Sequence, residues 1–131
     1  MKVWILIHGL LRRGDFGDVE LLHNGIKFKL PGSWLKKFGL SMIMPSFLAF
    51  YYGRSGELLI PYNMVLGVEL VEEKAGLATP KAPFIRLHFR DERGGHQSIT
   101  FAVQGWGISG VKPDETLNLY EQIRQLIGLN R

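Results

Sequence analysis

The sequence predicts a mainly β protein: a small antiparallel β-barrel or sandwich closed by one C-terminal α-helix. Three observations support this fold class. Apolar and polar residues alternate along 84–90 and again along 97–104, a polar turn separates the two segments, and an amphipathic segment follows at 113–128. A period of two places one face of a strand against a core and the other against solvent. A hairpin with one dry face needs a cover, which the helix can supply.

The two alternating segments are expected to pair as a hairpin. Its core-facing side chains would be Ile85, Leu87, Phe89, Ile99, Phe101 and Val103. Its solvent-facing side chains would be Arg86, His88, Arg90, Ser98, Thr100 and Ala102.

The predicted helix has recognisable ends. Pro113 suits a first turn, and Asp114 and Glu115 suit the positive end of the helix dipole. Gly128 is expected to end the helix in a left-handed conformation. The apolar stripe that would cover the sheet consists of Leu119, Tyr120, Ile123, Leu126 and Ile127.

Earlier in the chain, short apolar segments separated by turn residues predict further strands. The expected strands are 2–10, 19–30, 57–60 and 65–72, with one or two more in 40–52 and a strand or short helical turn at 34–38. Turns are expected at Pro31-Gly32-Ser33 and at 53–56, a polar link at 12–18, and the least ordered loop at 74–83. The total is about seven strands, as in a small barrel or sandwich.

The composition is that of an ordinary globular domain. The chain has 131 residues, of which 46% are hydrophobic and 21% charged, and this balance argues against disorder. It contains no cysteine, so disulfides, thiolate metal sites and cysteine nucleophiles are excluded. Segment 1–11 lacks a signal-peptide cleavage site, and the apolar run 39–52 contains Pro45 and is shorter than the roughly 20 residues that span a bilayer. We expect one cytoplasmic domain over 1–131.

No motif predicts catalysis. Residues 105–110 match the dinucleotide pattern G-x-G-x-x-G, but a Rossmann unit needs another parallel strand and an acidic residue after the helix, so a loop is expected here. The segment 53–56 resembles a nucleophile elbow, yet Glu57 stands where that turn needs glycine. His88 and His96 are expected to approach each other as a surface pair rather than a metal site. The sequence predicts no enzyme, and no catalytic, cofactor or metal site.

Positive charge is the feature that points most directly to a function, since the net charge is +4. Lysines on one strand face, beside a turn and an aromatic residue, can hold an anionic headgroup. The alternatives are a solvated face with Trp34 in the core, or a nucleic-acid surface, which is the less favoured partner. The candidate residues for binding an anion or lipid are Lys27, Lys29, Trp34, Lys36, Lys37 and Arg54.

With these elements in place, the chain from about Asn24 to Leu129 resembles the pleckstrin-homology-like (PH-like) superfamily, including its GRAM and bacterial relatives. The resemblance implies a strongly bent seven-stranded sheet with the helix plugging one open end. Segment 1–18 lies outside the pattern and would be an N-terminal extension or an extra strand, paired with an edge of its own sheet or a neighbour's. The segments that carry the resemblance are 25–29, 34–38, 47–52, 60–62, 65–70, 83–87, 99–102 and 115–127.

The resemblance implies an interaction domain, because members of this superfamily bind phosphoinositides, peptides or partner domains. Lipid-binding members place basic residues at the first hairpin, where Lys29, Lys36 and Lys37 fall. Our first hypothesis is a protein or peptide partner, bound by strand addition at a sheet edge, or a homo-oligomer. The second is peripheral binding to anionic lipid, at the inner face of a membrane, through the basic residues.

Overall fold

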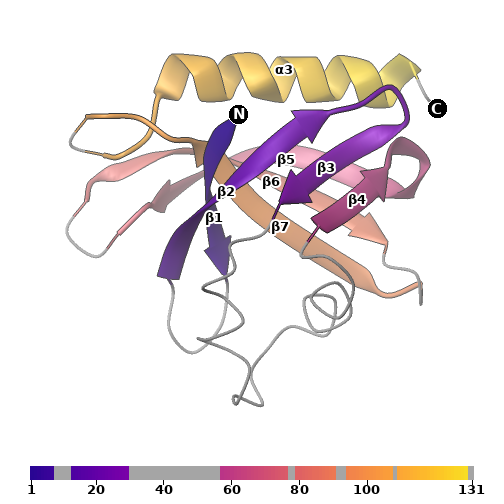
Figure 1. The fold of residues 1–131 in the computed structure, drawn as a ribbon, viewed down its shortest axis with the longest axis horizontal. Helices are drawn as coiled ribbons and strands as arrows, with labels where there is room; N and C mark the ends of the chain where they lie inside the picture. Colours follow the sequence, from indigo (N-terminus) through magenta and orange to yellow (C-terminus); the bar gives the residue numbers. More distant parts are fainter. Residues whose placement is uncertain (8–12, 30–56, 77–78, 91–93, 108, 130–131) are drawn as a thin grey trace.

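The computed structural model describes residues 1–7, 13–29, 57–76, 79–90, 94–107 and 109–129. This part of the chain forms one antiparallel sheet of seven strands with one α-helix across it (Figure 1). The mainly β fold with a terminal helix is therefore confirmed. The strands are β1 (Lys2–Ile7), β2 (Arg13–Leu21), β3 (Gly25–Lys29), β4 (Glu57–Pro61), β5 (Val65–Lys74), β6 (Lys81–Arg90) and β7 (His96–Val103). A short 3-10 helix, η1 (Tyr62–Met64), connects β4 to β5, and the C-terminal helix is α3 (Pro113–Leu129).

The N-terminal strand lies in the middle of the sheet. The strand order is β4-β3-β2-β1-β7-β6-β5, so β1 pairs with β2 on one side and β7 on the other, where Val3 is level with Val103. The prediction that this segment pairs with a sheet edge is therefore wrong. The central position of β1 agrees with its apolar side chains on both faces. Val3 and Ile5 enter the main core, while Trp4 and Leu6 are covered on the opposite face.

The sheet bends back on itself without closing in the described part. β4 and β5 are its two outermost strands, yet only η1 separates them in the chain. A link of this length spans at most about 14 Å, so the two edges must come close at this corner. Tyr62 fixes the corner: it is 1% exposed, its hydroxyl donates to the carbonyl of Leu22 at 2.6 Å, and its N–H donates to the carbonyl of Asn24. The turn between β2 and β3 is thereby tied to the link between β4 and β5.

The inner face of the sheet and α3 enclose the main core. All seven described strands, η1 and α3 contribute to it, and α3 packs against β5, β6, β7 and η1. The predicted inward faces of β6 and β7 and the predicted stripe of α3 are confirmed, with Tyr120 and Leu126 half-buried at its margin. The core consists of Val3, Ile5, Val19, Ile26, Phe28, Leu58, Ile60, Tyr62, Val65, Ile85, Leu87, Phe89, Ile99, Phe101, Val103, Leu119, Ile123 and Ile127.

Helix α3 begins as predicted and ends later. Pro113 is its first residue, and Asp114 and Glu115 lie in its first turn. Gly128 does not terminate the helix, which continues one residue further. Ile127 is buried in the main core, and this packing holds the last turn. No helix in the described ranges has the length and apolar character needed to cross a membrane.

The outer face of the sheet is partly covered, which corrects one expectation. Thr100 and Ala102, which the alternation assigns to solvent, are fully buried. The segment after β7 folds over this face, where Trp4 Nε1 donates to the carbonyl of Gly110 at 2.8 Å. A pattern within one strand does not reveal this cover, because the covering residues belong to other elements. They form an outer cluster of Leu6, Ala75, Ala82, Phe84, Ala102 and Val111, with Trp4 and Val71 packed against it.

Three strand boundaries also differ from the predictions. Segment 12–18, expected as a polar link, belongs largely to β2. The alternation that would have predicted this strand is interrupted in the sequence by glycines at 14 and 17. Segment 19–30, expected as one strand, is divided by a turn at 22–24. The loop expected over 74–83 is shorter, since β5 reaches Lys74 and β6 begins at Lys81. The expected elements between 30 and 56 lie outside the described residues.

Candidate functional site

Lys27 and Lys29 lie on the outward face of β3, as predicted, but acidic residues accompany them. Across the pair of β2 and β3, Lys27 is level with Glu20 and Lys29 with Asp18. Opposite charges in facing positions stabilise a sheet, and they also lower the net positive charge of its surface. The described part of the basic face is thus balanced by carboxylates. The other predicted binding residues, Trp34, Lys36, Lys37 and Arg54, lie outside the described residues.

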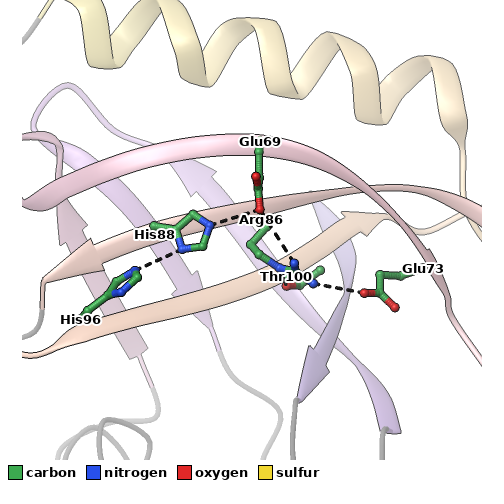
Figure 2. A network of polar contacts seen from close by, with 6 residues as sticks. All are labelled: Glu69, Glu73, Arg86, His88, His96 and Thr100. Atoms are coloured by element: carbon green, nitrogen blue, oxygen red, sulfur yellow. Dashed lines mark hydrogen bonds and ion pairs between the residues drawn. The ribbon is translucent and has the colours of Figure 1, made fainter.

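A polar network crosses the outer face of β5, β6 and β7 (Figure 2). Arg86 stands at its centre, 3.1 Å from a carboxylate oxygen of Glu73 and 3.8 Å from one of Glu69, and it donates to the hydroxyl of Thr100 at 3.2 Å. The register makes this possible, because Glu69, Arg86 and Thr100 are level on three adjacent strands. The side chain of Glu73 is only 10% exposed, so its charge requires a partner such as Arg86.

Two histidines extend this network toward solvent. His88 Nε2 lies 3.3 Å from Glu69 Oε1, and His88 Nδ1 lies 3.1 Å from His96 Nε2 (Figure 2). A carboxylate can only accept, so the hydrogen on His88 Nε2 is the donor to Glu69. In the neutral ring Nδ1 then accepts, and His96 Nε2 donates to it. The predicted approach of these two histidines across their hairpin is confirmed.

The glycine-rich segment 105–110 connects β7 to α3 and bonds to itself. The N–H of Gly105 donates to the carbonyl of Gly110 at 2.9 Å, and the N–H of Gly110 donates to the carbonyl of Gly107 at 3.0 Å. A dinucleotide site would need a parallel strand beside this turn, whereas every described strand pair is antiparallel. The prediction of a loop is confirmed. Trp106, which the sequence does not single out, is 98% exposed in it.

Strand β5 is the longer of the two outermost strands of the described sheet. Its ten residues pair with β6 on one side, and no described strand lies on the other. Leu70 is 39% exposed and shares a face with Val68, which packs against the main core. Leu66, 44% exposed, is the extra residue of a bulge between Val65 and Gly67. Apolar surface thus continues from the core to solvent along this edge.

The sequence did not single out β5, because edge position is a property of the sheet order and not of the strand.

Within the described residues, no three His, Cys, Asp or Glu side chains are arranged to hold a metal ion. A comparison of the sequence with models of protein families finds no match, and a comparison with curated proteins finds none either. The two candidate sites are therefore identified from the structure alone. They are the outer edge of β5 and the polar network on the outer face of β5, β6 and β7.

Proposed function

We propose that this protein is a non-enzymatic, PH-like interaction domain that binds an extended segment of a partner protein along β5. The observation that carries the proposal is the edge of this ten-residue strand, which no described strand covers. The bent antiparallel sheet and the helix packed across its core support the resemblance to the PH-like superfamily. An added strand would extend the sheet through main-chain hydrogen bonds, each contributing about 0.5–1.5 kcal/mol.

The bulge limits where a strand can be added. The extra residue at Leu66 disrupts the ladder locally, and bulges of this kind protect edges against pairing. The segment from Val68 to Lys74 is in continuous register with β6 and offers a regular edge. Covering the exposed part of Leu70 would contribute about 1 kcal/mol, because full burial of a leucine is worth about 1.5–3 kcal/mol.

The charges of β5 indicate what kind of segment would bind. Between Val68 and Lys74 the strand carries Glu69, Glu72 and Glu73, and the first two are exposed. Facing opposite charges favour pairing and like charges oppose it. The partner segment would therefore alternate apolar residues with lysine or arginine. A second copy of β5 would bring the same glutamates, so a different protein is favoured over a homo-oligomer.

The experiment is a selection of linear peptides of about ten residues, displayed on phage, against the immobilised protein. Enriched peptides are then synthesised, and their affinities measured by fluorescence anisotropy. The expected peptides are basic and alternate in polarity. Leu70→Lys should weaken binding about tenfold, because it removes apolar cover and adds a charge that repels the peptide. Leu59→Lys is the matched control, since Leu59 is 40% exposed on β4, the other outer strand.

Equal weakening by both substitutions, or enrichment of no peptide, would overturn the proposal. Light scattering on the free protein addresses the homo-oligomer. A dimer that Leu70→Lys dissociates would show that a second copy occupies the edge of β5 despite its glutamates, and a monomer agrees with a different partner.

Peripheral binding to anionic lipid is the second candidate function. Trp106 favours it, because an indole that is 98% exposed can enter a lipid interface. The acids facing Lys27 and Lys29 weigh against the basic face. Sedimentation with liposomes, with and without anionic lipid and at two salt concentrations, tests it. Anionic-lipid-dependent binding that is lost in Trp106→Ala, or in the double variant Lys36→Glu and Lys37→Glu, would support it, and no binding at any composition would remove it.

A further inference from the structure

The histidine pair on the hairpin of β6 and β7 has the geometry of a chelate. His88 Nδ1 and His96 Nε2 lie 3.1 Å apart (Figure 2). The side chain of His88 is 29% exposed and His96 is exposed, so an ion from solvent reaches both. We propose that His88 and His96 together bind one divalent first-row transition-metal ion. This site lies on the outer face, and its two ligands belong to β6 and β7 rather than to the edge strand β5.

The nitrogen separation matches two ligands of a single ion. Imidazole nitrogens bind such ions at about 2.0–2.1 Å. If one ion lies at this bond length from both nitrogens, their separation of 3.1 Å corresponds to a nitrogen–metal–nitrogen angle of about 95–102°. This value lies between the angle of about 90° in tetragonal sites and that of about 109° in tetrahedral ones. His96, whose side chain is exposed, can adjust its ring to direct the lone pair of Nε2 at the ion.

The other nitrogen of His88 supplies a second, independent observation. Metal-binding histidines almost always donate their remaining N–H to a carboxylate or carbonyl, which fixes the tautomer and the orientation of the ring. His88 Nε2 lies 3.3 Å from Glu69 Oε1, and Arg86 lies 3.8 Å from the same oxygen. The lone pair of His88 Nδ1 is therefore already directed toward His96 before an ion binds.

A metal ion can replace the hydrogen bond between the two histidines without net loss of a proton from the protein. Without metal, His96 Nε2–H donates to His88 Nδ1. On binding, His96 moves that proton to its own Nδ1, and the ion takes the place of the shared hydrogen. Within the described residues, no third side chain is placed to join the two histidines as a ligand. Among divalent ions, Cu²⁺ should bind tighter than Ni²⁺ or Zn²⁺.

The test is calorimetric titration of the full chain with CuCl₂ and NiCl₂ in a non-coordinating buffer. One ion per chain is expected, with His88→Ala and His96→Ala each weakening binding at least tenfold. His23→Ala is the matched control, because His23 is exposed in the turn between β2 and β3, and it should leave the affinity unchanged. Glu69→Ala should weaken binding about 10–100-fold, and Glu69→Gln less, because the amide oxygen still accepts from His88.

Electron paramagnetic resonance of the Cu²⁺ form gives a second readout. Two coupled nitrogens are expected in the wild type and one in each single variant, with circular dichroism confirming that the variants fold. Absence of saturable binding would overturn the proposal. So would an affinity that survives replacement of both His88 and His96, or one that falls equally in His23→Ala.

Discussion

Replacing Ile123 with alanine is expected to remove much of the free energy that holds α3 on the sheet. Ile123 is 0% exposed and lies between Leu119 and Ile127 on the buried stripe of the helix. Truncating a buried isoleucine costs about 2–5 kcal/mol, through lost transfer free energy and the cavity left behind. We expect about 3–4 kcal/mol, because β6 and β7, against which α3 packs, are each paired with a strand on both sides and collapse little into the cavity. That is a large share of the about 5–15 kcal/mol that stabilises a typical domain.

Leu117→Ala is the matched control, because it removes a similar side chain from the same helix where the residue is 41% exposed. It should cost less than about 1 kcal/mol, and the two substitutions differ by only a few tenths of a kcal/mol in helix propensity. Urea unfolding followed by circular dichroism and tryptophan fluorescence gives both values. The midpoint of the Ile123→Ala variant should fall with the slope unchanged. Equal costs at the two positions would refute the packing of α3 on the inner face.

Two further substitutions probe the corner and the centre of the sheet. Tyr62→Phe should cost about 1 kcal/mol through its lost hydrogen bond. Burial raises the pKa of the Tyr62 phenol above 10.0, so this contribution to stability is complete below about pH 10 and is lost as the pH rises through the folded-state pKa. Urea unfolding at pH 8 and pH 11 should show a larger loss of stability in the wild type than in the variant. Gly17→Ala should cost about 1–3 kcal/mol, because a Cβ there would lie 2.6 Å from Ile5 Cδ1 and 2.7 Å from the carbonyl oxygen of Lys29. Gly67→Ala, whose Cβ meets no atom within 4 Å, should stay within about 0.5 kcal/mol of wild type, and similar losses at both glycines would contradict the register of β2.

Periodicity predicted those elements whose partners lie near in sequence. The hairpin of β6 and β7 and the stripe of α3 were predictable because each buries one regular face against the same core. The part of β2 before Val19 was missed, because close approach of the neighbouring strands requires glycine at position 17 and interrupts the apolar pattern there. The burial of Ala102 was missed because Trp4, from the N-terminal strand, lies beside it, and the burial of Thr100 because Arg86 on the neighbouring strand donates to it.

The site was less predictable than the fold, because it depends on strand order. His88 and His96 were expected to meet, since they belong to one hairpin. Glu69 comes from the next strand, and only the register of β5 with β6 places it beside His88. Likewise, Lys27 looks like part of a basic face in the sequence, while the register brings Glu20 opposite it.

The proposed strand addition at β5 is tested most directly by nuclear magnetic resonance of the isotope-labelled protein with a selected peptide bound. Strand addition predicts intermolecular nuclear Overhauser effects between the peptide backbone and residues 68–74, with slowed hydrogen exchange of the amides along that edge. Contacts confined to β4, or to the face that carries Lys27 and Lys29, would contradict it.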